Sequence, residues 1–292
     1  MRQPDRPLLI PWQGGLGNQL FELSAGLVTT ARSGRPVVFT DDWLQHPAAG
    51  ETARSFALHG LVGPTETAST PVMRGLRRTD IWSRRRVVEG LSDDDALARV
   101  RTGTRVLQGY FQRLDYVAEA WPALRQRLAG SQVRAHRELV RERSSDIGTL
   151  HYRLGDYLSN PGAQRHHGAT APAYYRDVIR HEAETTGISR WQVVSDQPAA
   201  ALDLLRSCDL PPGIELSTAQ SSDDWSDLVA LASARVCVIA NSSFSWWAGY
   251  VAEKVGGTRV VAPRPWFAAA STPEPALFPD SWVRRERPLL GA

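Results

Sequence analysis

The sequence predicts an α/β protein with parallel sheets, because strand-like and helix-like segments alternate along both halves of the chain. Near the start, Leu8, Leu9 and Ile10 indicate a strand, and 35–42 indicates another. Between them, apolar residues recur at helical spacing from Leu20 onward, and Gly34 is placed to end the helix. This βαβ opening, repeated in a plainer form after residue 147, predicts doubly wound units.

The remaining elements follow from the same patterns. Segment 43–104 is irregular and rich in arginine, proline and glycine; 105–112 indicates a strand, and 113–129 a helix interrupted at Pro122. The polar stretch 130–147 indicates a charged helix or linker and the best domain boundary, so we expect domains at 1–140 and 141–292. In the second domain, strands are expected at 148–153, 191–195, 236–240 and 258–262, and helices near 172–186, 197–206, 223–234 and 243–255.

Composition bounds the class of protein. The 292 residues are 42% hydrophobic and 22% charged, which is typical of globular proteins, and the net charge of +3 is too small to indicate nucleic-acid binding. The two cysteines, Cys208 and Cys237, form no disulfide or metal-binding pattern, which fits a reducing compartment. With neither a signal-like start nor an apolar run of membrane-spanning length, a cytoplasmic location is expected.

The glycine turn "GGLGN" at 14–18 is the first candidate site. Its glycines allow close approach of a ligand to the backbone, and the helix that follows offers free N–H groups; Asn18 can cap that helix or reach a ligand. A dinucleotide fingerprint is the alternative, with Gly15, Gly17 and Asp41. However, Leu20 stands where that fingerprint needs glycine or alanine.

The second candidate is "HYRLGDY" at 151–157, at the end of the strand that opens the second half. His151 and Arg153 share one face of an extended chain, and an arginine at the end of a strand suits a bidentate phosphate contact. Asp156 can fix the turn or hold the arginine; a surface ion pair between Arg153 and Asp156 is the non-functional alternative.

The third candidate is "NSSFSWWAGY" at 241–250, which follows the apolar run 236–240. Ser242 and Ser243 can cap the next helix and present hydroxyl and N–H groups to a phosphate, or serve as caps alone. Trp246 and Trp247 are expected to pack against the sheet.

Two further patterns of charge occur along the chain, one acidic and one basic. Three acidic runs occur, at 41–42, 93–95 and 223–224, but no histidine or cysteine accompanies them at ligand spacing, so no metal site is predicted. The arginines within 74–86 favour an anionic partner. A solvated loop is the simplest interpretation, followed by a membrane surface or lipid-linked acceptor, with nucleic acid last.

Taken together, these segments resemble the α-1,2-fucosyltransferases of glycosyltransferase family 11. The glycine turn, "LQGYFQRLDYV" at 107–117, "HYRLGDY", "HHGATAPAYY" at 166–175, "VVSDQP" at 193–198 and 238–267 are similar to that family's blocks, in the same order. One departure is Leu154, which stands where the family motif has a second arginine and bears on substrate recognition more than on activity.

The resemblance implies a GT-B fold: two Rossmann-like domains facing a cleft, the first on the acceptor side and the second binding the donor. It implies inverting transfer of L-fucose from GDP-β-L-fucose to a sugar hydroxyl, with an α-1,2 bond to galactose as the expected product. The donor is the nucleotide sugar, and neither a metal nor another cofactor is needed. A nicotinamide-dependent oxidoreductase and a non-catalytic carbohydrate-binding protein are the alternatives from other classes.

The resemblance also implies roles for individual residues. Asp227 keeps the offset from Ser242 that a guanine-binding aspartate keeps in α-1,6-fucosyltransferases, and Asn18 matches an asparagine near the reacting centre of protein O-fucosyltransferases. His167 is the imidazole candidate for a catalytic base. The predicted catalytic residues are Arg153, Asn18 and His167, and the predicted donor-binding residues are Gly14, Gly15, Asn18, His151, Arg153, Asp156, Asp196, Asp227, Asn241, Ser242, Ser243 and Phe244.

Overall fold

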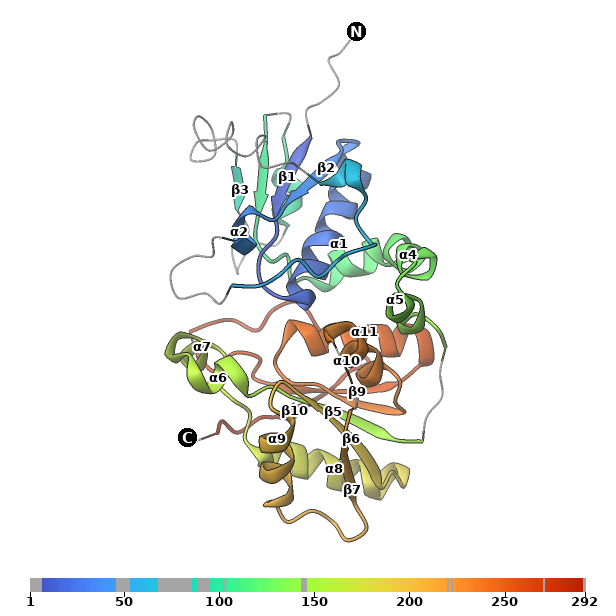
Figure 1. Cartoon of the computed structure of the whole chain (residues 1–292). Helices are drawn as coiled ribbons and strands as arrows, with labels where there is room; N and C mark the ends of the chain where they lie inside the picture. The colour runs from blue at the N-terminus through green and yellow to red at the C-terminus, as the bar shows by residue number, and fades with distance from the viewer. Residues whose placement is uncertain are drawn as a thin grey trace. The chain divides into compact units, whose positions relative to one another are not determined.

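A computed structural model describes residues 7–45, 53–67, 86–88, 95–101, 103–142, 146–219, 221, 223–269 and 271–290. The chain forms two compact units, Met1–Gln132 with Pro275–Leu277, and Val133–Glu274 with Phe278–Ala292 (Figure 1). Each unit is built on its own parallel sheet, which confirms the predicted α/β class with two parallel sheets.

The first unit contains a four-stranded sheet with helices from the same half of the chain. Its elements are β1 (Leu8–Pro11), α1 (Leu16–Ser33), β2 (Val37–Thr40), α2 (Asp42–Gln45), the 3₁₀ turn η1 (Pro64–Glu66), β3 (Arg86–Val88), the 3₁₀ turn η2 (Ala96–Arg99), β4 (Val106–Gln108) and α4 (Leu114–Gly130).

The order of strands in the first sheet is β2-β1-β4-β3, with every pair parallel. The chain therefore leaves β1 towards β2 on one side and returns to the other side at β4. This reversal makes the carboxyl ends of β1 and β4 the topological switch point, where ligands of open α/β sheets bind. Helix α1 ends as predicted, with Gly34 in the left-handed region at φ 68°.

Two predictions for this unit were wrong. Pro122 does not interrupt a helix, because α4 runs through it from Leu114 to Gly130. The strand expected over 105–112 ends at Gln108, because Gly109 has φ 154° and Phe111 has φ 50°, and neither conformation continues a strand.

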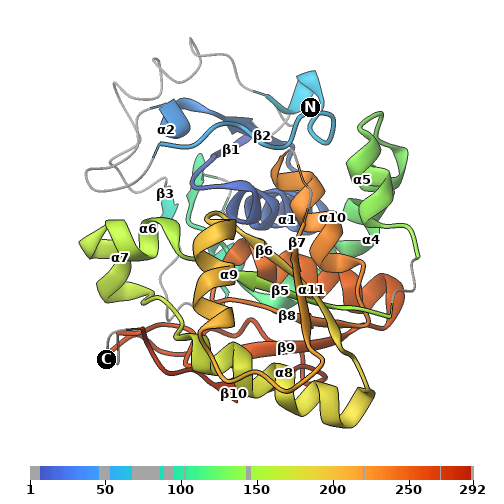
Figure 2. The ribbon, with the colours of Figure 1, turned by 60° about the horizontal axis from the view of Figure 1, so that its bottom comes forward.

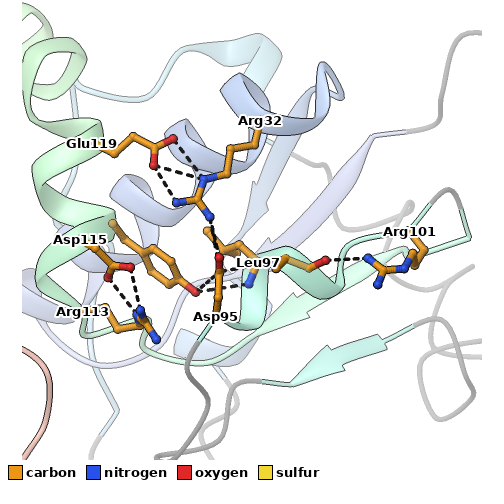
Figure 3. A network of polar contacts seen from close by, with 9 residues as sticks. Arg32, Asp95, Leu97, Arg101, Arg113, Asp115 and Glu119 are labelled. Atoms are coloured by element: carbon orange, nitrogen blue, oxygen red, sulfur yellow. Dashed lines mark hydrogen bonds and ion pairs between the residues drawn. The ribbon is translucent and has the colours of Figure 1, made fainter.

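A polar network ties the end of the irregular region to the helices of the first unit (Figure 3). Arg32 on α1 contacts Asp95 at 3.0 Å and Glu119 on α4 at 2.7 Å, and the Tyr116 hydroxyl donates to Asp95 at 2.8 Å. Arg113, the residue before α4, pairs with its neighbour Asp115 at 2.7 Å. Each exposed pair contributes little alone, but the network as a whole fixes the start of α4 relative to α1.

The second unit contains a six-stranded parallel sheet with helices on both faces (Figure 2). Its elements are α5 (Arg134–Leu139), β5 (Gly148–Tyr152), α6 (Gly155–Ser159), α7 (Pro161–His166), α8 (Pro172–Thr186), β6 (Arg190–Ser195), α9 (Pro198–Arg206), β7 (Glu215–Thr218), α10 (Asp224–Ala232), β8 (Val236–Val238), α11 (Ser243–Gly256), β9 (Arg259–Arg264) and β10 (Val283–Glu286).

The order of strands in the second sheet is β10-β9-β8-β5-β6-β7. Strands β6 and β7 follow on one side of β5, and β8, β9 and β10 on the other, so the switch point lies between β5 and β8. Helices α8 and α9 contact each other, and α10 packs against α11 and α5 (Figures 1 and 2). All five residues of β5 are buried, as expected for the centre of a doubly wound sheet.

The sequence did not predict β7 or β10, the two edges of this sheet. Their residues are polar or partly exposed, with Glu215 and Ser217 on β7 and Arg284, Arg285 and Glu286 on β10. Edge strands carry such residues because only one side pairs with the sheet, so the apolar pattern that marks a central strand is missing.

Candidate functional site

The carboxyl end of β5 carries the two residues that the strand pattern singled out. His151 is the fourth residue of β5 and Arg153 directly follows the strand, one strand away from the start of α11. Tyr152, between them, is fully buried on the opposite face. The switch point of the second sheet therefore presents a histidine and an arginine together.

Asp196 at the end of β6 holds this arginine. An Arg153 guanidinium nitrogen lies 3.0 Å from Oδ2 of Asp196, while Oδ1 accepts the Leu154 N–H at 3.0 Å. The two side chains keep 22% and 24% of their surface exposed, so an anion can reach the arginine from solvent. A methyl group on Gly155 would lie 2.2 Å from Oδ2, so this glycine leaves room for the carboxylate.

Asp196, from the neighbouring strand, is a partner of Arg153 that the sequence analysis did not identify. The ion pair between Arg153 and Asp156 stays a prediction, because the side chain of Asp156 lies outside the described residues. Leu154, where the family motif has an arginine, is fully buried in the core of the second unit, so its side chain packs with apolar neighbours.

His151 is 3% exposed, and among the described residues its Nδ1 has no hydrogen-bond partner. Burial, together with the positive charge of Arg153, lowers the pKa of His151 from 6.5 to about 3. Its ring lies 5.4 Å from that of Phe244 on α11. A neutral imidazole with an unsatisfied nitrogen therefore lies between the arginine and the start of α11.

Helix α11 begins at the carboxyl side of β8 with Ser242 as its N-cap, as expected, but the Ser242 side chain makes no capping hydrogen bond. The first N–H groups of a helix have no partner within it, and they lie at the positive end of its dipole. Ser243 and Phe244 in the first turn are half-buried, so this end is open to a ligand. Trp246 and Trp247 are buried as predicted, and Trp246 stacks on Tyr250 at 5.0 Å.

Beside the start of α11, the side chain of Asn241 binds the loop that carries His167. The Asn241 side chain donates to the backbone carbonyls of His167 at 2.9 Å and Trp266 at 3.2 Å. Arg287, 4% exposed, donates to the same two carbonyls. The His167 ring stacks on Tyr157 with the centroids 5.0 Å apart. These contacts fix the loop that carries His167 against the start of α11.

Asp227 lies in the first turn of α10 and accepts a hydrogen bond from the Ser221 hydroxyl. Burial raises the pKa of Asp227, and the neighbouring charges of Asp224 and Asp223 act in the same direction. Asp223 caps α10 by accepting the Ser226 N–H at 2.9 Å, so this residue of the acidic run 223–224 has a structural role at a helix start.

In the first unit, the glycine turn lies at the switch point of its own sheet. Gly14 has φ 69°, a conformation that favours glycine, and Gly15 is the N-cap of α1. Asn18 therefore does not cap the helix but lies within its first turn, where its Oδ1 accepts a hydrogen bond from Gln112 at 2.9 Å.

Two fully buried polar residues of α1 were missed by the sequence analysis. Gln19 donates to the carbonyls of Gly14 and Ser55, both at 3.0 Å, and accepts the Ala57 N–H at 2.8 Å. Glu22 accepts the Gln13 N–H with both carboxylate oxygens at 3.1 Å. Both support the glycine turn; their occurrence within a strongly apolar helix was the available signal, because a polar side chain is buried only when it has partners.

Three further expectations concern the arginines within 74–86, metal binding and membrane-spanning helices. The arginines within 74–85 are not described, and nor is the side chain of Arg86. Across the described ranges, no three His, Cys, Asp or Glu side chains are grouped as metal ligands would be. No helix there has the length and apolar character needed to cross a bilayer.

Comparison with known proteins places the chain in a family. Residues 101–286 match the sequence model described as Glycosyl transferase family 11. The chain is 32% identical over 149 residues to an α-1,2-colitosyltransferase of Escherichia coli, and 30% identical over 143 residues to the E. coli O-antigen biosynthesis glycosyltransferase WbnK. The first alignment covers 50% of this chain and 49% of the relative, and the second covers 48% and 45%. The chain therefore spans about half the length of each relative.

Among solved structures, similarity is found to a GDP complex of POFUT1, with a TM-score of 0.46 and 10% identity over 88% of this chain and 97% of that one. A GDP complex of Arabidopsis thaliana FUT1 gives 0.48 and 10% identity over 89% of this chain and 71% of that one.

The neutral, buried state of His151 predicts a dependence of stability on pH. The unfolded chain binds a proton at this histidine below pH 6.5 and the folded chain only near pH 3, so folding loses stability on acidification from pH 7 towards 3. The loss per histidine approaches about 1.4 kcal/mol for each pH unit. The free energy of unfolding, measured with urea between pH 7 and 5, should therefore fall less steeply with decreasing pH for His151→Gln than for wild type. Parallel curves would contradict this, and His59→Gln, at an exposed position, serves as the control.

Proposed function

Because the chain belongs to Glycosyl transferase family 11, we propose that it transfers a GDP-linked 6-deoxy sugar to a sugar hydroxyl, with L-fucose from GDP-β-L-fucose as the first choice. The expected product carries an inverted, α-1,2 bond to galactose, and no metal takes part. The colitosyl transfer named for one relative keeps a second deoxy sugar open as donor. The observation that carries the proposal is the ion pair between Arg153 and Asp196, which holds the arginine at the switch point of the second sheet, beside the start of α11.

The chemistry explains why this arrangement suits the reaction. The acceptor oxygen forms a bond to the anomeric carbon of the donor, the bond from that carbon to the phosphate oxygen breaks, and GDP leaves with an added negative charge. A guanidinium and the N–H groups of a helix start stabilise such a charge, which is the task of a metal ion in other transferases. Arg153 and the first turn of α11 are assigned to the diphosphate on these grounds.

The other donor contacts are assigned as follows. His151, neutral and with an unsatisfied nitrogen, faces the nucleotide, and Phe244 lies beside it. Asp227 accepts from the guanine edge, and Ser242 and Ser243 present their hydroxyls to the phosphates. Asp196 acts by holding Arg153, Asp156 by its place in the following turn, and Asn241 by bracing α11.

The first unit is assigned to the acceptor side of a GT-B cleft. Gly14 and Gly15 let the backbone approach the sugar nucleotide, and Asn18 lies near the reacting centre. Acceptor contacts are expected in the irregular stretch 43–104. Segment 53–67 is one described part of that stretch, and Gln19 ties it to the glycine turn. Arginines 74–86 remain the candidate contact with a membrane or lipid-linked acceptor. The cytoplasm is the proposed location.

A nucleotide panel tests the proposal. GDP should raise the thermal midpoint in the presence of a chelator, and UDP, ADP and NAD should raise it much less, because the site is proposed to read guanine and needs no metal. The same preparation should release GDP from GDP-fucose when galactosides are supplied. Equal stabilisation by UDP and GDP, or an effect abolished by chelation, would contradict the proposal.

Substitution of Arg153 tests the diphosphate assignment. Removing one charge-assisted contact to the leaving group costs about 2–4 kcal/mol in the transition state. Arg153→Lys should be nearly as damaging to kcat as Arg153→Ala, because lysine cannot reproduce the planar fork that binds two oxygens. Steady-state kinetics that place the lysine variant within a few-fold of wild type would refute the assignment.

A departing phosphate can take the acceptor proton late in a dissociative step, so a strong protein base is not required. Asn18→Ala should therefore lower kcat more than His167→Ala, with GDP binding kept in both. If His167→Ala abolishes turnover while Asn18→Ala stays active, His167 is the base and the assignment is wrong.

A further inference from the structure

The segment after β4 belongs to the block at 107–117 that resembles the family, yet the proposed function gives it no role. In the sheet order β2-β1-β4-β3, the carboxyl ends of β1 and β4 flank the switch point. The glycine turn follows β1, and residues 109–112 follow β4. Gln112 and Asn18 therefore meet where a ligand of this sheet is expected.

The contact between these two residues decides which end of the Asn18 amide is available. Gln112 Nε2 donates to Asn18 Oδ1 at 2.9 Å, so the Asn18 oxygen is occupied and its NH₂ group remains for a ligand. A methyl group on Gly14 would lie 2.3 Å from Asn18 Nδ2, so the NH₂ group occupies space that only a glycine leaves open. The amide donor thus lies against the turn that lets a ligand approach.

The backbone around Gln112 is built to hold it there. Phe111 is fully buried and has φ 50°, and it is the one non-glycine residue with positive φ among the described residues. Such a conformation persists when the surroundings fix it, and it is found at functional sites. On one side, Gln13 donates to the Gly109 carbonyl at 3.4 Å; on the other, Arg113, in the network of Figure 3, donates its N–H to the Phe111 carbonyl at 2.9 Å.

We propose that Gln112 is a positioning residue for glycosyl transfer, which holds the Asn18 amide with its NH₂ group directed to an oxygen of the bound sugar nucleotide or acceptor. This inference rests on the proposed function, because it gives a role to Gln112 through the role of Asn18. Gln112 itself touches no reacting atom. Its effect should appear in kcat and depend on Asn18.

Gln112→Glu is the sharpest variant. It keeps the shape of the side chain but offers only acceptors, so Asn18 has to turn its NH₂ group towards residue 112 and its oxygen towards the ligand. We expect kcat for GDP-fucose to fall ~10-fold to 100-fold, less than the ~100-fold to 1000-fold seen when a single oriented donor is removed, because the Asn18 amide is turned and not lost. The KM for the donor should change less than about 3-fold, since transition-state stabilisation alone is reduced. For the same reason, GDP should raise the thermal midpoint of the variant about as much as that of wild type. Gln126→Glu, an exposed change of the same type on α4, should leave kcat unchanged.

A double-mutant cycle separates this role from a structural one. In the Asn18→Ala background, Gln112→Glu should cause no further loss of kcat, because the group that it orients is gone. Losses that multiply in the double variant, or a Gln112→Glu enzyme within 2-fold of wild type while Asn18→Ala is impaired, would overturn the inference and leave the proposed function intact. Full activity of Asn18→Ala would instead overturn the role of Asn18 and, with it, that of Gln112.

A second readout does not depend on the substrate. The side-chain NH₂ signals of Asn18 can be assigned in a ¹⁵N–¹H spectrum by their disappearance in Asn18→Ala. They should shift in Gln112→Glu, where the NH₂ group becomes a donor to a carboxylate, and stay in place in Gln126→Glu. Unmoved signals in Gln112→Glu would overturn the inference even if GDP-fucose proved to be the wrong donor.

Discussion

The site of the second unit depends on the contact that Asp196 makes with Arg153 and Leu154, the two residues that follow β5. One carboxylate oxygen binds the Leu154 N–H and the other binds the Arg153 guanidinium, both at 3.0 Å. The first bond fixes the backbone as it leaves the strand, and the second fixes the direction of the side chain. Charge-assisted bonds of this kind are strong and directional. A flexible arginine is thereby held in one direction, as the proposed diphosphate contact requires, and Gly155 leaves the adjacent space to the carboxylate.

In both units the polar residues lie at the switch point of the sheet, but their chemistry differs. In each sheet the strand order reverses at that point, and the two segments that leave the carboxyl edge there carry the polar residues. In the second unit these are charged and aromatic groups beside a helix start, suited to a diphosphate. In the first they are amides, Asn18 held by Gln112 and the glycine turn held by Gln19, suited to neutral hydroxyls. In both cases neighbouring side chains set the geometry, Asp196 in the second unit and Gln112 with Gln19 in the first.

The sequence predicted elements and residues whose signals are local. Short apolar runs predicted the central strands and period-3.6 patterns the long helices, and Arg153 was identified because it follows a buried strand. The contact of Arg153 with Asp196 was not predictable, because Asp196 reaches the same turn from another strand, 42 positions after Leu154 in the sequence. The conformation of Phe111 was equally hidden, since its aromatic neighbourhood indicated a strand and only tertiary packing holds it at positive φ. Edge strands β7 and β10 were missed because their residues carry no apolar pattern.

The central claim is that Arg153 and the start of α11 bind a nucleotide diphosphate. A crystal structure of the protein with GDP, grown with a chelator, tests it most directly. The account predicts diphosphate oxygens about 2.7–3.2 Å from the Arg153 guanidinium and from N–H groups of the first turn of α11, with Asp196 still bonded to the Leu154 N–H. A diphosphate bound elsewhere, with Arg153 contacting Asp196 alone, would contradict it.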